Sequence, residues 1–138
     1  MIDVELAQKL RDAGVRWDPV AGDRFVVIDP PMPDEVYVVS DMTVDVHRFS
    51  TGTVIGFNGT TEWALDSIEH RRALWLPREE QLRRLLGGTF VALTRADDGW
   101  TVTTRRGDTE FTFEHGDAEQ AYGLALLALI VGVAELPR

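Results

Sequence analysis

The apolar residues in the first part of the chain change their spacing, and this spacing predicts the local structure. Between Asp3 and Gly14 they recur every three or four residues, as on one face of a helix, with Asp3 as N-cap and Gly14 as the C-terminal stop. From Val15 the period is closer to two, which predicts a hairpin of residues 15–17 and 24–28. Residues 29–34 hold three of the six prolines and are expected to form a surface loop.

The middle of the chain has shorter patterns. A strand is predicted at 35–40, and two more strands are predicted within 42–57, around a turn at residues 50–52. A capped helix is expected to begin at Thr60 and to end near His70. This region therefore predicts three strands and one helix.

The last part of the chain has the clearest signals. A helix is expected to start with Pro77 in its first turn, to bury Leu82, Leu85 and Leu86, and to end at two glycines, 87 and 88. Three strand-like runs, separated by turn residues, then predict a meander at 89–95, 100–105 and 109–114. Asp117 caps a final helix expected to run from 118 to about 134.

This element order predicts the fold class. Strands joined by tight turns pair antiparallel, so we expect an α+β fold with a mostly antiparallel sheet, or two sheets. Helices are expected to pack on one face or end, and the C-terminal meander is followed by a buried helix. The length of 138 residues favours one domain over 1–138, with a possible subdivision near residues 29–34.

Charge and composition narrow the partners. The net charge is −9, although residues 71–106 hold eight arginines against four acids. An acidic protein repels phosphates and anionic membranes, so nucleic acid and membrane are not expected as partners. The chain has no cysteine, one lysine (Lys9) among fourteen basic residues, and acids at its N-terminus where a signal peptide is basic. We expect a cytoplasmic protein of a bacterium with a GC-rich genome.

Two resemblances rest on specific residues. The segments Leu76-Pro77 to Leu82, Leu85 to Gly87, Asp98 to Trp100 and Asp117-Ala118, with Leu126, resemble residues shared by small phage-associated bacterial proteins of unknown function, over about residues 76–130. The whole chain is similar to short actinobacterial proteins sometimes named pilus assembly proteins of the Flp or tight-adherence type. That name belongs to ATPase-like proteins, and this sequence has no Gly-x-x-x-x-Gly-Lys-Ser/Thr run to bind a phosphate.

No reactive pattern stands out in the sequence. His47, His70 and His115 lie in different predicted elements, without the helical i,i+4 spacing of a metal-binding pair. The glycine-rich run 52–61 is compatible with a small-anion site if its amides open a helix at Thr60. Neither a cofactor nor a metal is therefore expected. A small enzyme that uses carboxylates with His115 or His47, and an anion binder at 52–61, remain as alternatives.

The final helix points instead to contact with proteins. It is apolar on two faces, whereas a helix that covers an ordinary sheet needs only one. We therefore expect a non-catalytic interaction or accessory protein that binds a protein partner or a second copy of itself. The candidate surface combines the second apolar face with a basic stripe: Leu124, Leu127, Ala128 and Val131, with Arg71, Arg72, Arg78, Arg83 and Arg84.

Overall fold

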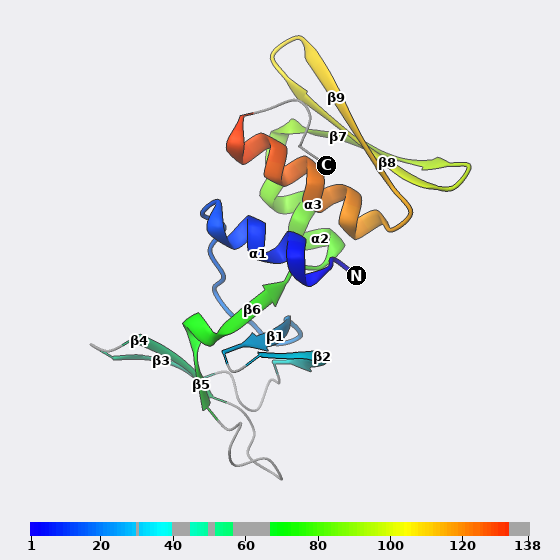
Figure 1. The fold of residues 1–138 in the computed structure, drawn as a ribbon. Coiled ribbons are helices and arrows are strands. Elements are labelled where there is room, and N and C mark those ends of the chain that lie inside the picture. Colours follow the sequence, from blue (N-terminus) through cyan, green and yellow to red (C-terminus); the bar gives the residue numbers. More distant parts are fainter. Residues whose placement is uncertain (30, 40–44, 50–51, 57–66, 133–138) are drawn as a thin grey trace. The chain divides into compact units, whose positions relative to one another are not determined.

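The computed structural model describes residues 1–29, 31–39, 45–49, 52–56 and 67–132 (Figure 1). These residues form an α+β fold with three α-helices and three antiparallel sheets of three strands each. The predicted α+β class is confirmed, including the C-terminal meander and the buried helix after it. None of the described helices has the length and apolar character needed to cross a membrane.

Two compact units divide the chain. Unit 1 combines residues 1–15 with 77–138, and unit 2 comprises residues 16–76. The single domain over 1–138 stays a prediction, and the proline-rich segment 29–34 lies inside unit 2. Unit 1 is therefore built from two pieces of chain that are far apart in the sequence.

In unit 2, two sheets have the strand orders β2-β1-β6 and β3-β4-β5. A one-turn 3-10 helix, η2 (His70–Arg72), leads into β6. The strands are β1 (Arg24–Ile28), β2 (Pro31–Val38), β3 (Asp45–Phe49), β4 (Gly52–Gly56), β5 (Ser67–Glu69) and β6 (Ala73–Leu76). The two strands predicted around the turn at 50–52 are confirmed as β3 and β4.

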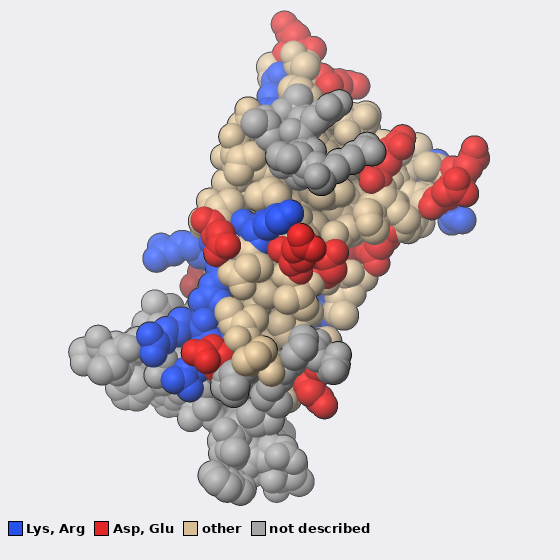
Figure 2. Space-filling view, in the orientation of Figure 1, with Lys and Arg blue, Asp and Glu red and all other residues tan. Residues whose placement is uncertain are grey.

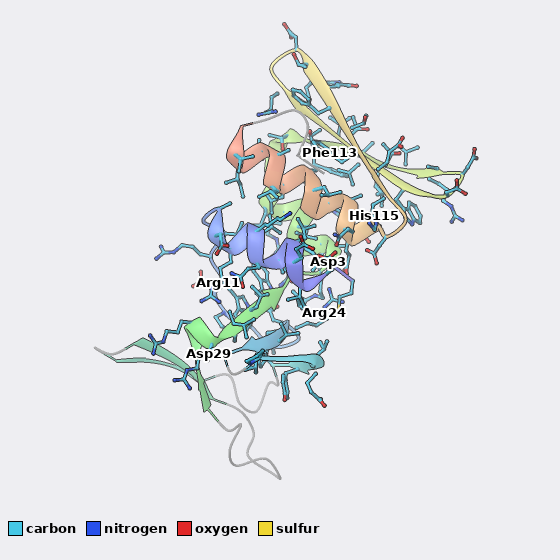
Figure 3. All side chains as sticks on the ribbon, in the orientation of Figure 1. Asp3, Arg11, Arg24, Asp29, Phe113 and His115 are labelled. Atoms are coloured by element: carbon cyan, nitrogen blue, oxygen red, sulfur yellow. The ribbon has the colours of Figure 1, made fainter. Side chains whose placement is uncertain are left out.

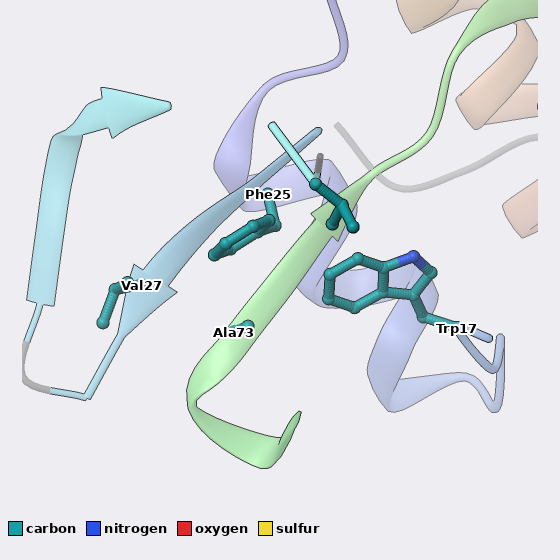
Figure 4. Packing of buried hydrophobic residues seen from close by; sticks show 5 residues of the cluster. Trp17, Phe25, Val27 and Ala73 are labelled. Carbon is teal, nitrogen blue, oxygen red and sulfur yellow. The ribbon is translucent and has the colours of Figure 1, made fainter. Parts of the chain in front are cut away.

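A small apolar core holds the first sheet together. Phe25 on β1 lies between its cross-strand neighbours Tyr37 and Trp75, and the Trp17 ring packs against it with centroids 5.5 Å apart (Figure 4). The Trp17 indole N–H donates to the buried carboxylate of Asp23, with Nε1 2.8 Å from Oδ2. This hydrogen bond ties the loop before β1 to the turn that starts the strand.

Three predictions in unit 2 are wrong. Residues 15–17 form no hairpin with β1, because β2 and β6 occupy both edges of that strand. Residues 31–34 belong to β2 rather than to a loop, and Pro31 fits there because β2 is an edge strand of its sheet. The helix predicted to reach His70 is replaced at residues 67–69 by β5, while residues 60–66 lie outside the described residues.

Unit 1 contains three helices and one sheet. The helices are α1 (Val4–Asp12), α2 (Glu79–Leu86) and α3 (Ala118–Val131), and a 3-10 turn, η3 (Gly87–Thr89), follows α2. The meander has the order β7-β8-β9, with β7 (Phe90–Ala96), β8 (Gly99–Arg106) and β9 (Thr109–His115). The helix α3 packs against β8, β9, α1 and α2.

Helix caps in unit 1 agree with the sequence. Asp3 accepts the backbone N–H of Leu6, and Asp117 accepts that of Gln120, so both predicted N-caps are confirmed. Two details of α2 are corrected. Pro77 precedes the N-cap residue Arg78 instead of lying in the first turn. Leu85 is 42% exposed, because the inward side of α2 carries Gln81, Leu82 and Leu86.

Candidate functional site

The final helix is apolar on several sides, and other elements of unit 1 pack against several sides of it. Gly123 faces Leu6 of α1 and Ile2, which precedes that helix, and the ring of Tyr122 stacks on Phe90, with centroids 5.6 Å apart. The sheet supplies a further apolar surface through the buried side chains of Val102 and Phe113. Most of the apolar excess of α3 is therefore used inside the unit.

This packing changes the predicted interaction surface. Leu127 and Ala128 are 8% and 1% exposed, so these two residues are core and are not available to a partner. Leu124 is half-buried, whereas Val131 is 50% exposed. The two residues are seven positions apart and lie on the same side of the helix.

Ile130, which was not part of the predicted surface, is 39% exposed beside Val131 in the last described turn. We call Leu124, Ile130 and Val131 the α3 surface. No local sequence signal marks Ile130 as exposed, since exposure depends on which elements from other parts of the chain cover the helix. The candidate surface is therefore smaller than predicted and lies toward the C-terminal end of α3.

A polar cluster lies where the N-terminal ends of the three helices meet. The Met1 amino group is 2.6 Å from Asp117 Oδ2 and 3.5 Å from Glu119 Oε1. Gln120 accepts the Asp3 backbone N–H at 3.0 Å and donates its amide to Asp3 Oδ2 at 2.8 Å. The Glu119 carboxylate also accepts the first backbone N–H of α2, from Glu79, at 2.8 Å. At the start of each helix, a side chain of the cluster thus accepts a hydrogen bond from one of the backbone N–H groups that have no partner within the helix.

The cluster shifts the ionisation of its members. The pKa of the Met1 amino group is raised, mainly because this group donates a hydrogen bond to Asp117. Burial acts to raise the pKa of Asp117, but the hydrogen bonds from Met1 and from the Gln120 backbone outweigh it, so this pKa is lowered. Burial, with the charge of Glu79 next in size, raises the pKa of Tyr122, whose hydroxyl lies 3.4 Å from Glu79 Oε1. These shifts favour the ion pair and the neutral phenol.

His115 has a structural partner in this region. Its Nδ1 accepts the Asp117 backbone N–H at 3.0 Å, beside the start of α3 (Figure 3). Glu114, the adjacent strand residue, lies on the opposite face of β9 and does not converge with His115. Among the described residues no group of three histidines and carboxylates is arranged to hold a metal. The side chains of His47 and His70 lie outside the described ones.

The predicted basic stripe is distributed over both units. Arg71 and Arg72 belong to unit 2, whereas Arg78, Arg83 and Arg84 belong to unit 1. Arg78 Nε pairs with Glu80 at 3.0 Å, and Arg83 acts to lower the pKa of the buried Tyr122. On the face shown in Figure 2, acidic side chains lie at both hairpin tips of the meander and near the N-terminal ends of α1 and α3.

The glycine-rich run 52–61 is described only in part. Residues 52–56 form β4, the central strand of its sheet, and pair with β3 on one side and β5 on the other. Backbone amides that bond to neighbouring strands do not form a phosphate-binding loop. Residues 57–61, including the expected helix start at Thr60, lie outside the described residues.

Comparisons with protein-family models, curated proteins and solved structures give no match to this chain. The resemblances to phage-associated proteins and to the actinobacterial pilus-named proteins therefore stay predictions.

Proposed function

We propose that the chain is a non-catalytic interaction or accessory protein of the bacterial cytoplasm, and that it binds a protein partner or a second copy of itself through the α3 surface. The observation that carries the proposal is the exposure of Ile130 and Val131, at 39% and 50%, on a helix whose other apolar residues from Ala121 to Ala128 are buried except for the half-buried Leu124. When a partner covers apolar residues such as these, the removal of their surface from water stabilises the complex by about 25 cal/mol for each Å² buried.

The geometry near α3 supports a contact rather than a reaction. Asp117, Glu119 and Gln120 cap helix ends, and His115 accepts a backbone N–H of the same region. These groups are engaged in holding α1 and α2 to α3. They therefore support a scaffold on which the α3 surface is presented at a fixed position.

A matched pair of variants tests the proposal. Val131→Lys places a charge on the α3 surface, and lysine is tolerated at a helix C-terminus because it complements the helix dipole. Val20→Lys makes the same change at a 52% exposed valine in a turn of unit 2 and serves as the control. Sedimentation velocity reports self-association, and affinity capture from a bacterial lysate reports a bound protein.

We expect the wild-type chain to self-associate or to capture a defined protein, and we expect V131K but not V20K to abolish this binding. A wild-type chain that sediments only as a monomer and captures no protein would overturn the proposal. Equal loss in V131K and V20K would also contradict it, because the binding would then not depend on α3. Circular dichroism confirms that both variants keep their helices.

A ligand screen tests the rival classes directly. Nucleotides, inorganic phosphate, sugars and divalent cations are added singly while the melting temperature is followed. The proposal predicts no change. A concentration-dependent rise with any of these compounds would favour an enzyme or an anion binder instead.

A further inference from the structure

We draw no further inference here: the strongest candidate, the polar cluster of Met1, Asp3, Glu79, Asp117, Glu119 and Gln120 at the N-terminal ends of α1, α2 and α3, carries nothing, because its groups already bond to one another and no second observation points to a ligand.

Discussion

Gly123 of α3 and Leu6 of α1 approach so closely that a β-carbon at position 123 would lie 2.6 Å from Leu6 Cδ2. Ile2 Cδ1 would be 3.0 Å away on the same side. Both apolar side chains are buried, with exposures of 4% for Leu6 and 1% for Ile2. The absence of a side chain at position 123 is therefore what lets α1 lie against α3.

Enlarging residue 123 is predicted to loosen this contact. Gly123→Leu should destabilise the chain by about 1–3 kcal/mol, the usual cost of overpacking a core. In Gly123→Ala, a gain of about 1 kcal/mol in helix propensity offsets part of the strain. Urea unfolding, followed by circular dichroism, measures both changes.

A double variant separates strain at Leu6 from other effects. Leu6→Ala alone should cost about 2–5 kcal/mol, because it empties a buried site. Since the methyl group of Gly123→Ala fills part of that space, the two costs should not add, and the double variant should be more stable than their sum predicts. Additive costs would show that position 123 does not act through Leu6.

The ion pair between Met1 and Asp117 predicts a pH dependence. The folded pKa of Asp117 is lowered from 3.8, so its contribution to stability is present above about pH 4 and is lost as the pH falls through the folded value. The folded pKa of the Met1 amino group is raised from 8.0, so its contribution is complete below pH 8 and is lost as the pH rises through the folded value.

Asp117→Asn keeps an oxygen to cap α3 but removes the ion pair. We expect this variant to lose stability between these limits and to show a flatter pH profile at both ends. Glu114→Gln, an exposed change of the same type on β9, is the control and should leave the profile unaltered. Melting temperatures measured from pH 3 to pH 10 decide the result, and a D117N profile parallel to that of the wild type would contradict the assignment.

Like Gly123, Gly99 in the meander has no room for a β-carbon. A β-carbon at this position would overlap the carbonyl oxygen of His115 and lie 2.7 Å from the Cα of Gly116, and backbone atoms cannot move aside as a side chain can. Gly99→Ala should therefore destabilise the chain by at least about 1–3 kcal/mol. Gly88→Ala, where nothing lies within 4 Å, should be neutral or slightly stabilising in the same denaturation assay.

The buried carboxylate of Asp23 is predicted to be essential for unit 2. Asp23→Ala leaves the Trp17 indole N–H and the Val20 N–H, now 2.8 Å and 3.0 Å from Oδ2, without this acceptor. Leaving the buried Trp17 indole donor unsatisfied costs about 1–3 kcal/mol. Tryptophan fluorescence during unfolding should report this loss, whereas Asp29→Ala, at an exposed position, should unfold like the wild type. A wild-type midpoint for D23A would show that the hydrogen bonds contribute no net stability.

Local signals in the sequence predicted much of the fold. Asp3 and Asp117 are N-caps as expected, and the turns at 97–98 and 107–108 separate the three strands of the meander. Such features depend on neighbouring residues, so a single sequence contains them. The predicted hairpin of residues 15–17 with β1 is wrong because β1 pairs with β2 and β6. Local spacing does not show which distant strands pair.

The candidate surface was predicted only in part, for a related reason. Periodicity shows that α3 is apolar on more than one side, but it does not show which element covers each side. The N-terminal helix covers the side that contains Gly123, while Leu127 and Ala128 are buried among the packed elements of unit 1. Leu124 and Val131 keep partial exposure, and Ile130 joins them. Packing by a segment that is distant in the sequence therefore decides which apolar residues of α3 are exposed, and the local pattern does not show this.

The division of unit 1 between the two ends of the chain has a consequence for biosynthesis. The ribosome releases α1 before unit 2, but α3, against which Ile2 and Leu6 pack, emerges only after unit 2. Domains generally fold as units, from the N-terminal side, during synthesis. Residues 16–76 can therefore fold before α3, the helix against which α1 packs, has been synthesised. The N-terminal helix can therefore reach its packed position only after α3 has been synthesised.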